Sequence, residues 1–217
     1  MAATRHIHAR SIAVLAAGYV VGFAAYPNLL GPFLDQARFA RVLVAFTLPT
    51  TALVIYSLFR SLWRHDRVRS GNGAFEHTYH AIVLRVLLFV LALHTLVVIE
   101  LTGALSAVGL DTSPGRATSA GRAVVVLLGV VLVAIGNLLP RTRPNVAVGV
   151  RTKRTLSNPL LWQQVHRAGG YTTVALGIVI AVTGLVLTHT TMGAVVSAAA
   201  LAAAMTVIVS YRRYARA

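Results

Sequence analysis

The chain has 217 residues, of which 57% are hydrophobic and only 12% charged, and its mean hydropathy is +0.74. Soluble domains have about half apolar and about a quarter charged residues, so this composition excludes an ordinary soluble enzyme. The absence of cysteine excludes thiolate metal sites, thiol nucleophiles and disulfides. The formal net charge of +15 resembles that of a nucleic-acid-binding protein, but in a membrane protein the basic residues must first be sorted by membrane side.

Six apolar runs are long enough to span a bilayer, since about 20 apolar residues in a helix cross a hydrocarbon core of about 30 Å. They cover residues 11–30, 42–63, 79–105, 121–139, 171–188 and 192–211. No alternation typical of a closed barrel is present, so all six are predicted to be helices. The first run lacks the short core and small-residue cleavage site of a signal peptide, so we expect it to be retained. The predicted fold is an all-α, polytopic membrane protein with two halves, residues 1–120 and 121–217.

Lysine and arginine are distributed unevenly between the two sides of this predicted topology. Arg60 and Arg122, at the ends of their spans, are counted with the adjacent loops. The two termini and the even-numbered loops then carry 15 basic residues and the odd-numbered loops carry four, which leaves Arg85 inside a span. Positive loops stay on the cytoplasmic side, so both termini are predicted to be cytoplasmic. The net charge then reflects topology and attraction to anionic lipid, and no direct nucleic acid binding is expected.

Small residues predict where helices approach closely. Gly18 and Gly22 are four residues apart in the first span, a spacing that favours a helix contact. Gly177 and Gly184 share one face of the fifth span, and the sixth span is rich in alanine. Only a few residues separate these last two spans, so we expect them to form a tight antiparallel pair.

The third span contains most of the ionisable side chains predicted to lie inside the membrane: Arg85, His94 and Glu100. Arg85 and Glu100 are roughly 22 Å apart along the helix, which excludes a direct pair and suggests that each extends to its own interface. His94 lies near the middle, where it is either a neutral side chain hydrogen-bonded to another helix or a functional group in proton transfer, metal binding or haem ligation.

Glu76 and His80, just before and at the start of this span, have the i, i+4 spacing of metal ligands. Two residues without a third ligand do not make a zinc site, so no metal is predicted.

The loop between the fourth and fifth spans, residues 141–167, is the longest polar stretch and contains several structural signals. Asn137 lies near the end of the fourth helix, which Pro140 is expected to terminate. Pro144 with Asn145, followed by Gly149, predicts a tight and ordered connection.

The second part of this loop predicts a short helix on the membrane surface. Ser157 or Asn158 can cap it, and Pro159 suits its first turn. Trp162 is expected to anchor it at the cytoplasmic interface, and Gly169 with Gly170 is expected to turn the chain into the fifth span.

The order of residues in this region closely resembles the SdpI-type immunity protein family of bacterial multi-pass membrane proteins. The resemblance rests on Gly136, Asn137, Pro140, Pro144, Asn145, Gly149, Arg151, Thr152, Thr155, Leu156, Trp162, His166, Gly169 and Gly170. With the flanking spans it covers the C-terminal half, whereas residues 1–120 show no clear match.

The resemblance implies a non-enzymatic protein of the bacterial cell membrane that gives resistance to a membrane-active toxic peptide and can hold a small transcriptional repressor at the membrane. The implied partners are therefore the lipid bilayer, an extracytoplasmic toxic peptide and a cytoplasmic repressor, and no cofactor is expected. Arg151, Lys153 and Arg154 could bind an acidic partner or simply set the topology. His166 could be a histidine at a helix end that bonds the loop backbone.

Two alternatives remain open from the residues alone. His80 and His166 are both predicted near the cytoplasmic surface and could ligate haem in a b-type electron carrier. His94 and Glu100 could serve a small proton-coupled transporter, although the six spans show no internal repeat.

Overall fold

The computed structural model describes residues 2–29, 38–70, 75–104, 117–187 and 189–216, and these form an all-helical membrane protein. Six of its helices are long and apolar enough to cross a membrane, which confirms the predicted fold class. The elements in chain order are α1 (Ala2–Ala25), η1 (Tyr26–Asn28), α2 (Arg38–Ser70), α3 (Glu76–Thr102), α5 (Ala117–Gly136), η2 (Leu139–Arg141), α6 (Lys153–Ser157), α7 (Pro159–Val186) and α8 (His189–Arg216).

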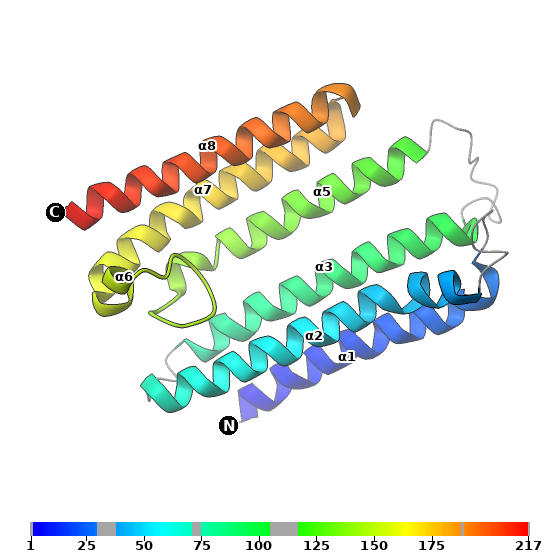
Figure 1. Ribbon diagram of the computed structural model, residues 1–217, viewed down its shortest axis with the longest axis horizontal. Coiled ribbons are helices and arrows are strands. Elements are labelled where there is room, and N and C mark those ends of the chain that lie inside the picture. Colours follow the sequence, from blue (N-terminus) through cyan, green and yellow to red (C-terminus); the bar gives the residue numbers. More distant parts are fainter. Residues whose placement is uncertain (1, 30–37, 71–74, 105–116, 188, 217) are drawn as a thin grey trace.

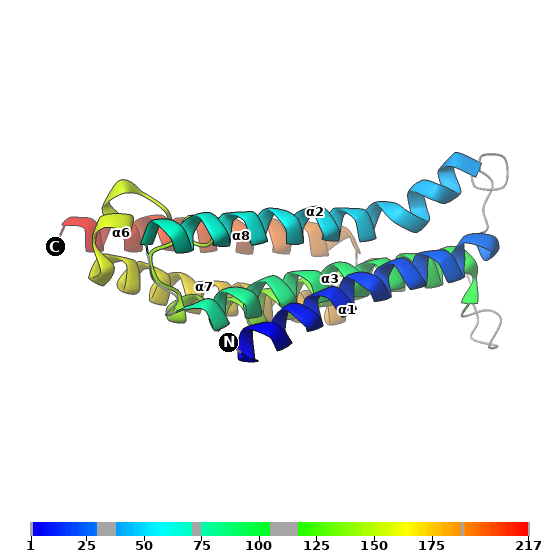
Figure 2. The ribbon, with the colours of Figure 1, turned by 90° about the horizontal axis from the view of Figure 1, so that it is seen from below.

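The helices form two groups that meet between α3 and α5 (Figure 1). Helices α1, α2 and α3 pack into a bundle, and α7 lies between α5 and α8. Figure 2 shows α2 on the same side of the molecule as α8, above the layer that contains α1, α3 and α7. Both termini lie at the end of the molecule that carries the loop with α6. The most basic segments predicted from the sequence therefore gather at one end.

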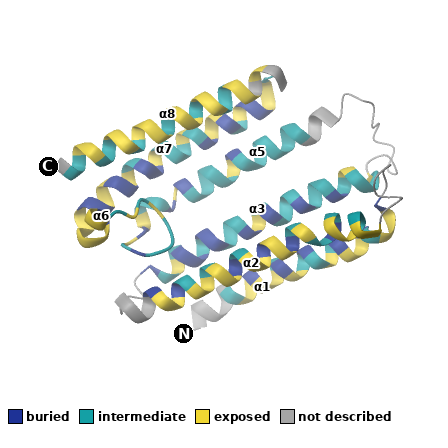
Figure 3. Ribbon diagram, in the orientation of Figure 1, coloured by how far each residue is buried: buried dark blue, intermediate teal, exposed yellow. Residues whose placement is uncertain are grey.

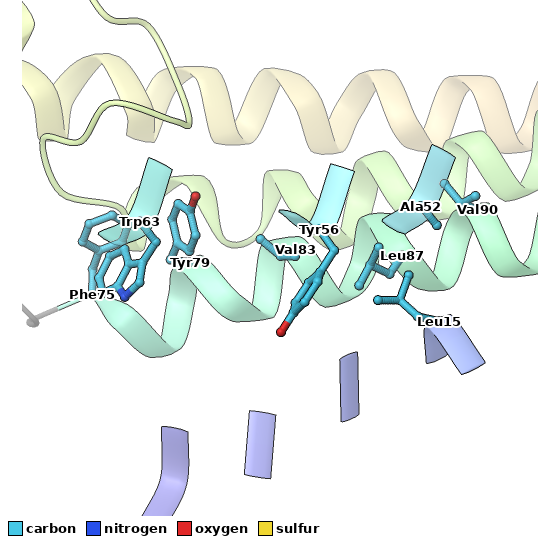
Figure 4. Packing of buried hydrophobic residues seen from close by; sticks show 9 residues of the cluster. All are labelled: Leu15, Ala52, Tyr56, Trp63, Phe75, Tyr79, Val83, Leu87 and Val90. Atoms are coloured by element: carbon cyan, nitrogen blue, oxygen red, sulfur yellow. The ribbon is translucent and has the colours of Figure 1, made fainter. Parts of the chain in front are cut away.

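Large side chains hold the N-terminal bundle together. Trp63, Phe75 and Tyr79 pack at one end of the bundle, and Leu15 with Leu87 packs toward its middle (Figure 4). Lipid tails are as apolar as these side chains, so it is close van der Waals packing that holds the helices together. The predicted close contact of the first span is confirmed, because a β-carbon at Gly22 would clash with the Ala45 carbonyl of α2.

Glycines hold α5 against α7. A β-carbon at Gly129 would lie 2.5 Å from the Ala181 nitrogen, and one at Gly177 would lie 2.6 Å from the Gly129 carbonyl oxygen. At Gly184 it would lie 2.9 Å from Val126. Gly177 and Gly184 thus face α5, and the expectation that they pack the last two spans together is wrong. Helix α8 does pack on α7, but its spanning segment contains no buried residue, and Figure 3 shows a mixture of exposed and intermediate residues along it.

The chain enters the fifth span differently from the prediction. The fourth loop does contain a short helix, but it is α6, and the segment predicted to lie on the membrane surface forms the first turns of α7. Asn158 caps α7 as expected, its side chain accepting hydrogen bonds from the backbone of Leu160 and Leu161 at 3.0 and 3.1 Å. The helix then continues through Gly169 and Gly170 without a turn. The predicted turn at this glycine pair is wrong, because a glycine can permit a close helix contact instead of a bend, as Gly170 does here.

Candidate functional site

Asn145 organises the turn of the fourth loop. Its side-chain oxygen accepts hydrogen bonds from the backbone N–H groups of Ala147 and Val148 at 2.9 and 2.7 Å. Its side-chain nitrogen donates to the carbonyls of Arg143 and Val148 at 2.7 and 3.2 Å. Asn145 itself is buried, so its side-chain atoms are shielded from water in these bonds. The predicted ordered connection is confirmed, and one side chain supplies most of its order.

His166 fastens the loop to α7 at Gly149. Its Nε2 accepts a hydrogen bond from the Val150 backbone N–H at 3.0 Å, and its Nδ1 lies 2.8 Å from the Trp162 carbonyl oxygen. A neutral imidazole protonated on Nδ1 satisfies both bonds at once. Gly149 has φ of +106°, and a β-carbon there would overlap the imidazole ring. The His166 ring therefore joins two segments that are sixteen residues apart in the chain. This agrees with the interpretation of His166 as a histidine that bonds the loop backbone.

Trp162 stacks on His166 and is bonded to the loop. The two rings are stacked with their centroids 3.8 Å apart and an interplanar angle of 14°. The indole nitrogen donates to the carbonyl and hydroxyl oxygens of Thr142, both at 3.2 Å. Only 1% of Trp162 is exposed, so the expectation that it anchors the protein at the membrane surface is wrong. It belongs to the core of the loop because its polar edge has a partner inside the protein.

Two threonines close the end of the loop at α6. The Thr152 and Thr155 side chains each accept a hydrogen bond from the other's backbone N–H, at 3.1 and 2.9 Å, which is a capping box. The Thr155 hydroxyl also donates to the Val150 carbonyl at 2.7 Å. Thr155 is fully buried, and Leu156 beside it is exposed.

A glycine contact joins the base of the loop to α7. A β-carbon at Gly170 would lie 2.8 Å from both the Gly136 carbonyl oxygen and the Pro140 ring. Pro140 sits in η2, directly after the turn that ends α5. Asn137 in that turn is exposed, and its backbone N–H bonds Val133 at 3.1 Å. Nearly all of the residues that carry the resemblance thus lie in the fourth loop or at the adjoining ends of α5 and α7, and most of them make contacts that order this loop.

The loop also contacts the other half of the molecule. Ala147 and Val148, the two residues whose N–H groups bond Asn145, pack against the N-terminal cluster that contains Trp63 and Tyr79. Figure 4 shows the loop passing above these two aromatic rings. The ordered loop therefore connects the two helix groups at one end of the protein.

Comparison with known proteins identifies this same segment. Residues 141–211 match the model of the SdpI/YfhL protein family. Over this segment the chain is therefore similar to the SdpI/YfhL family. The match covers the fourth loop and the last two spans, and so begins later than the C-terminal half proposed from the sequence. No curated protein and no solved structure matches the chain.

The basic residues of the SdpI/YfhL segment differ in their surroundings. Arg151 donates a hydrogen bond to the Val146 carbonyl and so takes part in the loop itself. Arg154 donates a hydrogen bond to the carbonyl of Ala215, near the end of α8, at 3.3 Å. Lys153 and Arg154 are both exposed on α6. No acidic residue occurs after Asp111 in the sequence, so the whole family segment lacks an acidic partner of its own.

The ionisable residues of α3 lie outside the SdpI/YfhL segment and apart from one another. Arg85 donates to the Ala81 carbonyl at 2.9 Å, one turn toward the basic end, which agrees with the predicted extension toward an interface. Glu100 is exposed near the other end of α3. The His94 ring is buried and faces the Gly18 backbone, but neither nitrogen reaches hydrogen-bonding geometry with a described group. The predicted inter-helix hydrogen bond of His94 is therefore not formed within the described residues.

The histidines considered for haem differ in their freedom to act as ligands. Both nitrogens of His166 are engaged with the backbone, so ligation would require the loop to come apart. His80 is buried, with its Nε2 3.8 Å from Glu76 and its ring 4.6 Å from that of His8. Within the described parts of the chain, no group of three histidine or acidic side chains is arranged to hold a metal ion. The geometry thus favours His166 as a structural residue of the loop.

Proposed function

We propose that this chain is an SdpI-like membrane protein that gives its host resistance to a membrane-active toxic peptide and carries out no enzymatic reaction. The family match over residues 141–211 is the single observation that carries the proposal. The described structure supports it, because the residues of the resemblance build one ordered loop on a six-span scaffold. Such a loop can present a constant surface while the spans face the lipid.

We place the protein in the bacterial cell membrane with both termini in the cytoplasm. The support is the distribution of basic residues, 15 on the side of the termini and four on the other. A single cysteine at Ser157, on the exposed end of α6, should be shielded from a membrane-impermeant thiol reagent in intact cells. A cysteine at Ser113, which lies outside the described residues, should react. Reaction of the cysteine at position 157 in intact cells would reverse the orientation.

We further propose that the fourth loop holds a cytoplasmic repressor. Lys153 and Arg154 present positive charge on α6, and the capping box fixes that helix in place. An acidic surface on a small protein would find no competing Asp or Glu side chain in this half of the chain. Arg151 adds charge to the same surface and also bonds the Val146 carbonyl, so it must be tested apart from the other two.

The test of resistance is deletion of the gene followed by exposure to a panel of membrane-active peptides. Deletion should sensitise the host, and expression of the intact chain should restore tolerance. The variant Lys153→Gln with Arg154→Gln should restore tolerance fully but lose repressor recruitment to the membrane. Unchanged sensitivity of the deletion strain across the panel would refute the resistance role. Normal recruitment by the double variant would refute the docking role of α6 alone.

A further inference from the structure

A cavity of about 340 Å³ opens where the fourth span ends and α7 begins. This volume falls in the range of roughly 300–1,000 Å³ that is typical of ligand sites. Its walls come from η2, from the loop that follows and from the first turns of α7. The lining residues are Pro140, Arg141, Thr142, Arg143, Pro144, Pro159, Leu160, Trp162 and Gln163.

Hydrogen bonds within the chain hold the walls in position. Trp162 donates to Thr142 across the cavity wall, tying α7 to the loop. The backbone N–H groups of Arg141 and Thr142 donate to Leu138 and Leu139, each at 3.0 Å. Three prolines restrict the remaining backbone. The cavity is therefore preformed, which reduces the entropy lost when a ligand binds.

The cavity carries two positive charges that nothing described neutralises. The Arg141 and Arg143 side chains are exposed, and neither makes a hydrogen bond or ion pair within the described part of the chain. The sequence has no acidic residue after position 111 to supply a partner. The guanidinium fork matches the oxygens of a phosphate group, and Arg is favoured for this recognition.

The apolar part of the wall points to a ligand with a hydrophobic body. Leu160 is 72% exposed and stands at the cavity beside the two arginines. Arg141 ends one membrane-spanning segment, and Pro159 begins the next. We infer from these span limits that the cavity lies at the boundary between hydrocarbon and headgroups, where a phosphate attached to acyl chains is at high local concentration.

We propose that this cavity binds the phosphate headgroup of an anionic glycerophospholipid. Arg141 and Arg143 engage the phosphate, Gln163 offers an amide to the headgroup, and Leu160 contacts the acyl chain. Basic pockets between membrane helices are known to select anionic headgroups in this way. The bound lipid would stabilise the junction of η2 and α7 on which the ordered loop rests. This site is separate from the α6 surface and does not depend on the proposed resistance or docking role.

The test measures lipid binding to the purified full-length protein in neutral detergent by native mass spectrometry. Phosphatidylglycerol should bind with defined stoichiometry, and phosphatidylcholine should bind much more weakly. Arg141→Gln with Arg143→Gln should weaken phosphatidylglycerol binding by about 30-fold, the effect expected for two basic residues. The matched control, Lys153→Gln with Arg154→Gln, removes the same charge from α6 and should change binding less than about twofold.

Two further measurements distinguish a specific lipid site from non-specific attraction between basic residues and anionic lipid. Arg141→Lys with Arg143→Lys keeps the charge but loses the planar fork, so its affinity should fall between that of the parent and that of the Gln variant. Inorganic phosphate should fail to displace the lipid at millimolar concentration, because it cannot contact Leu160. Equal losses in the α6 control and the cavity variant would overturn the site. Ready displacement by inorganic phosphate would overturn the lipid assignment.

Discussion

The two helix groups of this protein are held together in different ways. The α1–α2–α3 bundle packs mainly large aromatic and aliphatic side chains, with a glycine contact at Gly22, whereas α5 and α7 meet through several glycines that bring backbone against backbone. Volume-conserving exchanges are tolerated where large side chains pack, but no residue replaces a glycine at a backbone contact. The family match over residues 141–211 includes the α7 side of this glycine contact but not the α5 side. We therefore expect the stability of the α5–α7 contact to depend on the identity of single residues, and the stability of the α1–α2–α3 bundle to depend mainly on side-chain volume.

The largest effect is expected at Gly149. The variant Gly149→Val would force a branched side chain into the left-handed region and into the imidazole of His166. Together these effects should cost about 3 kcal/mol or more of unfolding free energy, and the protein should fail to accumulate in the membrane. Quantitative immunoblotting of membranes and thermal unfolding in detergent would measure both quantities.

The double variant Gly149→Ala with His166→Ala tests whether the ring is the cause. Once the ring is absent, adding a methyl group at position 149 should cost clearly less than it does in the parent. Equal costs in the two backgrounds would show that the contact with His166 is unimportant.

Adjacent glycines in α7 provide a matched comparison. Gly170→Ala places a β-carbon 2.8 Å from the Gly136 carbonyl oxygen and should destabilise the protein by about 1–3 kcal/mol. At Gly169 a β-carbon meets nothing within 4 Å, so Gly169→Ala should be neutral or stabilising by about 0.5–1 kcal/mol. Apparent melting temperatures from size-exclusion chromatography would rank the two. Similar melting temperatures would contradict the close contact of α5 and α7.

A smaller effect is expected for Trp162→Phe. Phenylalanine retains a ring to stack on His166 but cannot donate to Thr142. The loss of one buried hydrogen bond should cost about 1 kcal/mol, seen as a modest fall in melting temperature with normal membrane accumulation. A loss as large as that of Gly149→Val would mean that the indole nitrogen, not the stacking, holds the loop.

The smallest effect is expected in the N-terminal bundle. Leu87 is completely buried in the cluster of large side chains, yet Leu87→Met keeps nearly the same volume. It should cost about 1 kcal/mol or less, measured by the same thermal unfolding. If this change destabilised the protein more than Gly170→Ala, the proposed difference between the two regions would be wrong.

Local signals in the sequence predict much of this structure. Hydropathy predicts six spans, Asn145 after a proline predicts an ordered turn, and Asn158 before Pro159 predicts the start of a helix. Each of these features is decided within a few residues of the chain. The approximate span limits and the character of the fourth loop follow from them.

Contacts between distant residues could not be predicted in the same way. Trp162 has the sequence signature of an interfacial anchor, but its partner Thr142 lies twenty residues away and brings it into the core. The pairing of His166 with Gly149 likewise depends on the loop folding back on α7. A usable signal was present in the repeat of Gly170, Gly177 and Gly184 at seven-residue intervals, which marks one helix face but not which helix it meets. The sequence also gives no sign that Arg141 and Arg143 line a cavity, because both resemble basic residues that only set the topology.

Amide hydrogen exchange is the most direct measurement of whether the fourth loop is a fixed structure. The N–H groups of Ala147 and Val148 should be protected by Asn145, and that of Val150 by His166. Asn145→Ala should release the first two, and His166→Ala should release the third, while amides within α7 stay protected. Exchange of all three in the parent protein at the rate of an open loop would contradict the ordered loop on which the proposed function rests.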